Sequence, residues 1–232
     1  MFILSIMHSL WRTLDRPLLR DIALVCLAVG VIGLSYGAIA VASGFPVWFP
    51  VVLGLLVVAA SSEFLFIGII AAGGSPVAAV LAGLLVNARH LPFGLAVPDV
   101  LGRGAWRFLG THLMNDETVV FALAQKDTAR GRAAYWGCGL GIVVCWPAGA
   151  AIGGLAGTVI DDTGAFGLDA MFPAILLALI LPALRADRDK RRAALAGSAI
   201  ALAAVPFLPA GLPVLLALAG LSLTTARKKA VR

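Results

Sequence analysis

Apolar residues run along this chain in long segments that charged residues interrupt only at intervals. The longest stretches without a charged residue are 22–62, 64–88, 133–160, 170–184 and 193–226. A helix that crosses a bilayer needs about 20 consecutive, mostly apolar residues. Because the first and last of these stretches are long enough for two such helices each, the pattern predicts a membrane protein with several spans.

Glycine, proline and charged residues mark the expected ends of these helices. They predict an all-α transmembrane helix bundle of about eight spans, with seven as the alternative, and one integral membrane domain over 1–232. The last two helices are short and interrupted by prolines, so we expect broken helices or a helical hairpin there. The predicted helices cover 22–43, 47–72, 76–97, 105–125, 133–158, 169–185, 193–206 and 211–225.

The composition supports a lipid bilayer as the surrounding medium. Hydrophobic residues make up 61% of the chain and charged residues 13%, with a mean hydropathy of +1.00. A soluble domain has about 25% charged residues. The formal net charge of +6 is typical of basic cytoplasmic loops in a membrane protein, so we expect no nucleic-acid partner.

The basic residues fall into four clusters that alternate with pairs of predicted spans. The clusters are Arg12, Arg16 and Arg20; Lys126, Arg130 and Arg132; Arg185, Arg188, Lys190, Arg191 and Arg192; and Arg227, Lys228, Lys229 and Arg232. Cytoplasmic loops of membrane proteins are rich in Lys and Arg, so with eight spans both termini are expected in the cytoplasm. Arg89 then lies inside a span, while Arg103 and Arg107 fall on the opposite side of the membrane.

Ionisable residues inside the predicted spans are the candidates for chemistry. Each costs about 2.5–3.5 kcal/mol near the bilayer centre, and such residues commonly mark substrate or ion pathways. Together with a neighbouring amide, the candidates are Glu63, Asn87, Arg89, His90, Asp116 and Glu117.

The two acids are adjacent, so they lie about 100° apart around a helix. We therefore expect one to pair with Arg89 or His90 and the other to face water or substrate. His112, four residues before Asp116, lies on the same face and could pair with it.

Each candidate also has a structural interpretation. Glu63 could be a protonated side chain that hydrogen-bonds a neighbouring helix, and Arg89 could extend to the membrane surface. The acidic pair would be at the surface if its helix began only at 118. On the functional interpretation, Arg89 binds a carboxylate, His90 titrates near neutral pH, and an acid binds an ammonium group. That combination fits a zwitterion, such as a small amino acid with an apolar side chain.

Two other classes of protein remain open. The stretch GLSYG (33–37) matches the G-x-S-x-G pattern of hydrolases, with Ser35 as nucleophile and a membrane histidine as base, but that motif normally lies between a strand and a helix. A membrane scaffold that transports nothing is the third interpretation. The three cysteines have no metal-ligand spacing, and we expect no cofactor or metal.

Several of these stretches resemble the AzlC family of branched-chain amino-acid permeases. They are YGAIAVASGFP (36–46), NARH (87–90), NDET (115–118), CWPAGAAIGG (145–154) and GLDAMFPAILLALI (167–180). The resemblance covers about 22–185. It implies a secondary transporter in the bacterial inner membrane that exports branched-chain amino acids, driven by an ion or proton gradient. It also implies a small second membrane subunit of the AzlD type.

One stretch departs from the family pattern. Where the family usually has a Gly-Ala-x-Gln-Phe-like sequence, this chain has Ser61-Ser62-Glu63-Phe64. An acid in place of an amide adds a negative charge or a bound proton. Together with His90, Glu63 motivates the hypothesis of proton coupling.

Overall fold

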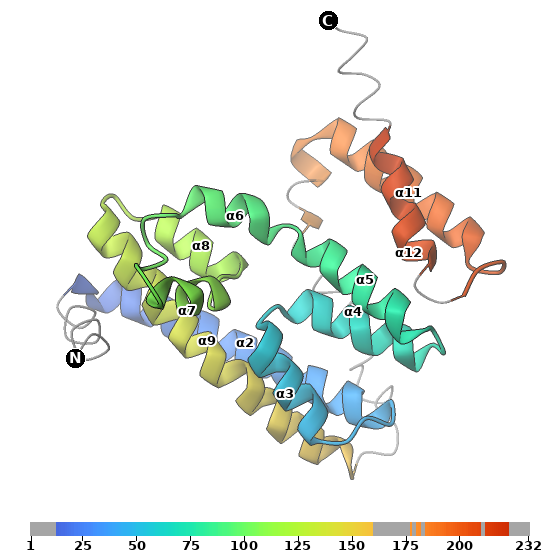
Figure 1. The fold of residues 1–232 in the computed structure, drawn as a ribbon, viewed down its shortest axis with the longest axis horizontal. Helices are drawn as coiled ribbons and strands as arrows, with labels where there is room; N and C mark the ends of the chain where they lie inside the picture. The colour runs from blue at the N-terminus through green and yellow to red at the C-terminus, as the bar shows by residue number, and fades with distance from the viewer. Residues whose placement is uncertain (1–12, 160–176, 178–179, 182–183, 210–211, 223–232) are drawn as a thin grey trace, which may run out of the picture. The chain divides into compact units, whose positions relative to one another are not determined.

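The computed structural model describes residues 13–159, 177, 180–181, 184–209 and 212–222, and these residues form helices joined by turns, with no strand among them (Figure 1). The predicted all-α class is confirmed. Most of the helix predicted over 169–185 lies outside the described residues, as does the stretch 167–180 apart from 177 and 180. The basic C-terminus also lies outside them.

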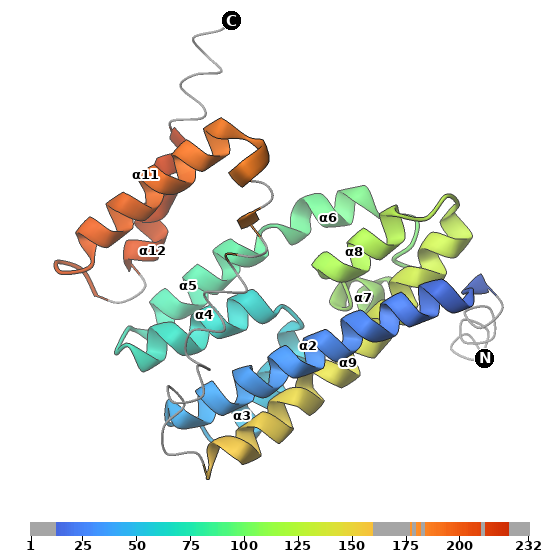
Figure 2. The same cartoon turned by 180° about the vertical axis from the view of Figure 1, so that it is seen from behind.

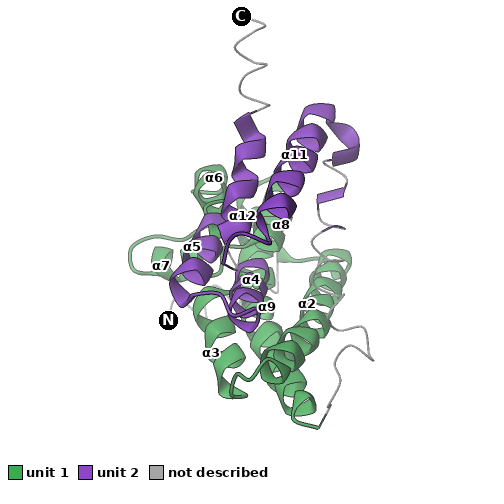
Figure 3. Cartoon of the chain, turned by 90° about the vertical axis from the view of Figure 1, so that its right-hand side faces the viewer, with its two compact units in different colours: residues 1–60, 87–163 green, residues 61–86, 164–232 purple. Residues whose placement is uncertain are grey.

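The chain forms two units (Figure 3). Unit 1 comprises Met1–Ala60 and Asn87–Thr163, and unit 2 comprises Ser61–Val86 and Gly164–Arg232. Among the described residues, unit 1 has the helices α2 (Arg16–Ala42), α3 (Trp48–Val57), α6 (His90–Ala96), α7 (Trp106–His112), α8 (Asp116–Leu123) and α9 (Thr128–Gly157). Unit 2 has α4 (Ala60–Ala71) and α5 (Pro76–Asn87), apart from Ala60 and Asn87 themselves, together with α11 (Arg188–Ala204), α12 (Leu212–Leu216) and the 3₁₀ helix η2 (Ala217–Leu221). The single membrane domain over 1–232 stays a prediction.

Three segments are long and apolar enough to cross a membrane, judged by length and composition over the described residues. They are Arg16–Ala42, Pro76–Ala96, which contains α5 and α6, and Thr128–Gly157. The other apolar segments are divided into shorter helices, and these divisions position the candidate site.

The two long helices of unit 1, α2 and α9, pack side by side and run in the same direction (Figures 1 and 2). Near their beginnings, Arg130 Nη2 lies 2.9 Å from Asp15 Oδ2. Further along, Cys26 Sγ donates to Cys138 O, and a side chain on Gly37 would collide with the carbonyl of Ala150. Contacts therefore advance together along both helices. Glycine permits this approach because it has no Cβ.

The two ends of unit 1 differ in charge. We call the end where α2 and α9 begin the basic end, since Arg16, Arg20, Lys126, Arg130 and Arg132 lie there. The opposite end, where Ala42 and Gly157 lie, is the far end. At the basic end, the hydrogen bond from Arg130 lowers the pKa of Asp15 below its ordinary value.

Helix α3 begins at the far end and stops partway along α9. Val47, which precedes it, lies beside Gly154 near the end of α9. After Val57 the chain turns at Val58, whose φ of 52° is left-handed. This backbone is a rare one for a β-branched residue. The prediction of one continuous helix over 47–72 is therefore wrong at Val58 and Ala59.

The helix predicted over 76–97 is also interrupted, between Asn87 and His90. Pro92 explains the position of the break. Proline has no N–H, and its ring clashes with the carbonyl four residues earlier, which here is that of Ala88. The Ala88 carbonyl instead accepts from Leu91 N at 3.1 Å.

The predicted helix over 105–125 is two short helices that enter and leave at the same end of unit 1. Trp136 Nε1 donates to Val100 O at 2.9 Å, so the chain before α7 lies beside the beginning of α9. At the turn between the two helices, Leu113 lies against Gly139, and after the turn Ala122 lies beside Gly131. With 7 and 8 residues, each helix is only about 11–12 Å long. A bilayer core is about 30 Å thick, so a span over 105–125 is wrong.

This hairpin changes the predicted topology. Ala42 is at the far end, and the chain from Val97 to Val100 is at the basic end, so an odd number of crossings separates them. The eight-span arrangement places two crossings there, over 47–72 and 76–97. Its assignment of Arg103 and Arg107 to the side opposite Lys126 is therefore wrong. Arg103 and Arg107 instead lie with the other basic residues at the basic end, as the positive-inside rule favours.

Cysteine labelling tests the hairpin directly. In a Cys145→Ala background, Arg103→Cys and Lys126→Cys should react with a membrane-impermeant thiol reagent from the same side of sealed vesicles, because both lie at the basic end. Thr158→Cys, at the far end, should react only from the opposite side. Labelling of Arg103→Cys and Lys126→Cys from opposite sides would restore the eight-span arrangement.

Candidate functional site

The beginnings of two interrupted helices meet in unit 1. Arg89, immediately before α6, and Asp116, the first residue of α8, form an ion pair with Nη2 and Oδ2 3.0 Å apart. Their side chains are 25% and 31% exposed. The predicted pairing of Arg89 with an acid of the following segment is confirmed. The paired geometry also favours this interpretation over an arginine that extends alone to the membrane surface.

Asn115 fixes the beginning of α8. Its Oδ1 accepts a hydrogen bond from Thr118 N, and Thr118 Oγ1 accepts one from Asn115 N, both at 2.9 Å. This reciprocal capping satisfies two backbone donors that the start of a helix otherwise leaves unpaired. It also places Asp116 and Glu117 in the first turn, where the helix dipole favours negative charge.

Two earlier expectations change as a result. The acids do not lie near the middle of a helix, as the pattern of apolar residues predicted, but at the beginning of one. Asn115 is absent from the predicted site residues, although N-D-E-T contains a helix-start signal: an N-cap residue followed by acids in the first turn.

His90 closes the gap between α5 and α6. Its Nδ1 lies 2.8 Å from Asn87 O. Because a carbonyl only accepts, the hydrogen is on Nδ1. The imidazole ring also meets the Phe93 ring edge-on at 5.8 Å. Any proton exchange by His90 that preserves this bond must therefore use Nε2.

His112 does not pair with Asp116. It ends α7, and the turn at Leu113–Asn115 separates it from α8, so the two residues do not share a helix face. Instead His112 Nε2 donates to Leu55 O, near the end of α3, at 2.9 Å. This bond joins the tip of the hairpin to the end of the half-length helix α3.

Three buried polar atoms near the ion pair have no hydrogen-bond partner among the described residues. They are Asn87 Oδ1, Arg89 Nε and Asn115 Nδ2. Asn115 is only 3% exposed. A buried polar group without a partner costs about 1–3 kcal/mol. Asn87 Oδ1 is an acceptor and the other two atoms are donors, so the segments that form the ion pair retain the capacity to bind a polar ligand.

Glu63 belongs to unit 2. It lies in the first turn of α4 and is 1% exposed, beside the similarly buried Ser62. Arg89 and Asp116 belong to unit 1, so a site that Glu63 shares with them stays a prediction.

The hydrolase motif has a different environment from the one it needs. Ser35 lies inside the continuous helix α2 and is 1% exposed. The turn that exposes a nucleophilic serine in G-x-S-x-G enzymes is not present at this position. Within the described part of the chain, no three His, Cys, Asp or Glu side chains are grouped so that they could hold a metal ion.

Helices long and apolar enough to cross a membrane, together with shorter apolar helices, define an all-α membrane protein. The sequence profile of the AzlC protein family matches residues 24–160. The chain therefore belongs to the AzlC family, and the resemblance inferred from its motifs is confirmed.

Two relatives place the chain further. It is 29% identical over 134 residues to an uncharacterized membrane protein of Haemophilus influenzae, covering 56% of this chain and 54% of that one. It is 26% identical over 203 residues to the branched-chain amino acid transport protein AzlC of Bacillus subtilis, covering 85% of this chain and 79% of that one. The match thus spans about half of the first relative. No solved structure shows significant similarity.

A double-mutant cycle measures the ion pair. Arg89→Gln and Asp116→Asn each leave one partly buried charge without its partner, which is destabilising. The double variant should lose less than the sum of the two, with a coupling of about 1–3 kcal/mol in the free energy of unfolding.

The exposed pair Arg20–Asp21, 3.6 Å apart with side chains 76% and 54% exposed, is the control. The cycle of Arg20→Gln and Asp21→Asn should show coupling close to zero, because exposed pairs contribute little. Additive effects at Arg89 and Asp116 would contradict the site as described.

Proposed function

We propose that this chain is the large subunit of a secondary transporter that exports branched-chain or other small apolar amino acids, coupled to the proton motive force. The observation that supports this most directly is the Arg89–Asp116 ion pair between the beginnings of two interrupted helices. Discontinuous helices of this kind form substrate and ion sites in secondary transporters. The Bacillus subtilis relative is named as a branched-chain amino acid transport protein.

The groups around the ion pair match both charged ends of an amino acid. A guanidinium has five N–H donors, and Arg89 Nε has no partner among the residues that the structure describes. Together with Asn115 Nδ2 it can bind a carboxylate. A substrate carboxylate that replaces Asp116 on Arg89 frees the Asp116 carboxylate for the substrate ammonium. Asn87 Oδ1 adds a further acceptor. In this exchange each charge keeps a partner, which lowers the cost of desolvation.

Proton coupling gives enough free energy for export. One charge that moves across 100 mV yields about 2.3 kcal/mol, which corresponds to roughly a 50-fold concentration ratio. Glu63 is the proposed proton carrier, because it is a buried acid where the family usually has an amide. His90 Nε2 is the second candidate.

The proposed setting follows the family. We infer a multi-pass protein of the bacterial inner membrane whose basic end, and both termini, face the cytoplasm. The proposed partner is a small AzlD-type membrane subunit. Two alternatives make different predictions: an intramembrane hydrolase requires Ser35, and a scaffold requires none of the ionic residues.

Flux in liposomes tests the transporter and its coupling. Protein reconstituted with its small subunit should move radiolabelled leucine, and an imposed pH gradient should change the rate. Arg89→Gln and Asp116→Asn should lower flux at every gradient by about tenfold or more, equivalent to at least about 1.4 kcal/mol. Glu63→Gln should retain flux and lose its dependence on the pH gradient.

The controls separate the alternatives. Ser35→Ala should leave flux unchanged, whereas a cleavage activity that disappears on that change would favour the hydrolase. Normal flux in both ion-pair variants would favour a scaffold whose partner subunit carries the flux. Wild-type flux that is indifferent to the pH gradient would remove proton coupling.

Asn115 variants separate capping from binding. Asn115→Ala loses the cap and should lower the free energy of unfolding by about 1 kcal/mol. Asn115→Asp keeps an N-cap acceptor but lacks the Nδ2 donor. It should therefore melt close to the wild type, yet bind substrate more weakly, read as a higher KM. A wild-type KM for Asn115→Asp would limit Asn115 to a structural role.

A further inference from the structure

Helices α6 and α8 run side by side from the ion pair toward the basic end of unit 1 (Figures 1 and 2). Arg89 and Asp116 join their beginnings. At their other ends a cavity of about 250 Å³ lies between them, lined by Ala96 and Val97 from the end of α6 and by Ala122 and Leu123 from the end of α8. The cavity and the ion pair therefore lie at opposite ends of the same two helices.

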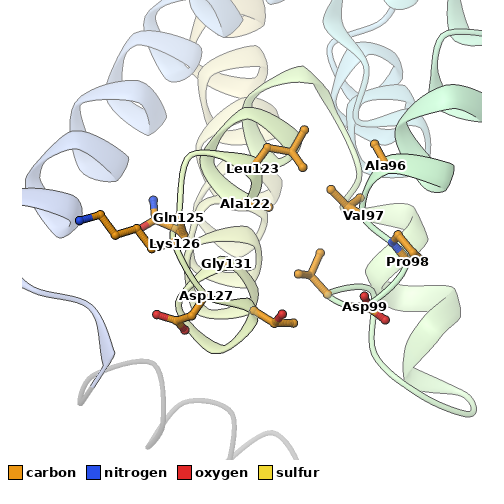
Figure 4. Close-up of a pocket in the computed structure, with 12 residues that line it drawn as sticks. Ala96, Val97, Pro98, Asp99, Ala122, Leu123, Gln125, Lys126, Asp127 and Gly131 are labelled. Atoms are coloured by element: carbon orange, nitrogen blue, oxygen red, sulfur yellow. The ribbon is translucent and has the colours of Figure 1, made fainter.

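The cavity continues to the surface of the basic end. Asp99 borders it on the α6 side, and Lys126 and Asp127 border it on the side of the loop before α9 (Figure 4). Both signs of charge are thus present at its rim. The volume is slightly below the range of about 300–1,000 Å³ that is usual for pockets of drug-sized ligands, which suits a smaller solute.

We propose that this cavity is the cytoplasmic entrance through which a small zwitterionic amino acid reaches Arg89 and Asp116. The inference rests on the proposed transport function. It depends on the hairpin α7–α8, because only a segment that returns to the basic end brings α8 alongside α6 with both helix beginnings directed inward. The entrance is cytoplasmic because the basic residues of unit 1 gather around it.

Residues of α6 differ in whether they line the cavity. Ala96 lines it, and it is small and exposed. Leu91 and Leu95 are also exposed, 74% and 84%, but they do not line it. Leu95 is therefore a neighbour of Ala96 that lies outside the cavity.

A bulky residue in the entrance should block transport without unfolding the protein. Ala96→Trp should lower leucine flux by about tenfold or more, equivalent to at least about 1.4 kcal/mol, whereas Ala96→Ser should transport normally. Leu95→Trp, one residue away and outside the cavity, is the matched control and should keep flux near the wild-type rate. Equal effects of the two tryptophans, or normal flux in Ala96→Trp, would overturn the proposal.

Thiol labelling tests the entrance independently of transport. In the Cys145→Ala background, Ala96→Cys should react with a charged, membrane-impermeant reagent from the cytoplasmic side, and Leu95→Cys should not. Saturating leucine should slow the labelling of Ala96→Cys. Labelling from the opposite side would overturn the entrance even if transport is confirmed. Cytoplasmic labelling of a protein that moves no amino acid would contradict the proposed function while supporting the opening.

Discussion

A helix can be interrupted inside a bilayer only where the freed backbone groups find other partners, and this constraint shapes unit 1. Each break has its own solution. His112 binds a carbonyl at the end of α3, His90 binds the carbonyl of Asn87, and Asn115 with Thr118 caps α8. Side chains that stand out as candidates for chemistry therefore also hold the backbone in place. The ion pair lies beside the breaks that these hydrogen bonds stabilise.

The sequence predicted the class of protein and the pairing of Arg89 with an acid. Long uncharged stretches were enough to indicate membrane helices, because burial in lipid leaves little freedom in composition. The pairing of Arg89 with an acid followed from the cost of leaving a charge alone in that medium. Asp116 and Glu117 are adjacent, so only one of them was expected to pair with Arg89, and it is Asp116 that does so.

The breaks were harder to predict, and each for its own reason. Pro92 and N-D-E-T are local signals that point to interruptions at 88 and 115, but apolar residues on both sides favour one long helix. Val58 has no such signal, since a β-branched residue with positive φ is selected by its surroundings and not by its own preference. Whether a broken segment crosses the membrane or turns back depends on packing against α9, which hydropathy does not contain.

The parallel packing of α2 against α9 has a consequence for biogenesis. Asp15 and Arg130, which join the two helices at one end, are 115 positions apart in the sequence. At a synthesis rate of about 5–20 residues per second, the earlier helix waits on the order of ten seconds for its partner to leave the ribosome. During that interval the glycine-lined groove of α2 has only lipid or the translocation machinery to cover it. During insertion, α2 must therefore stay in the membrane before α9, the helix that packs against it, has been made.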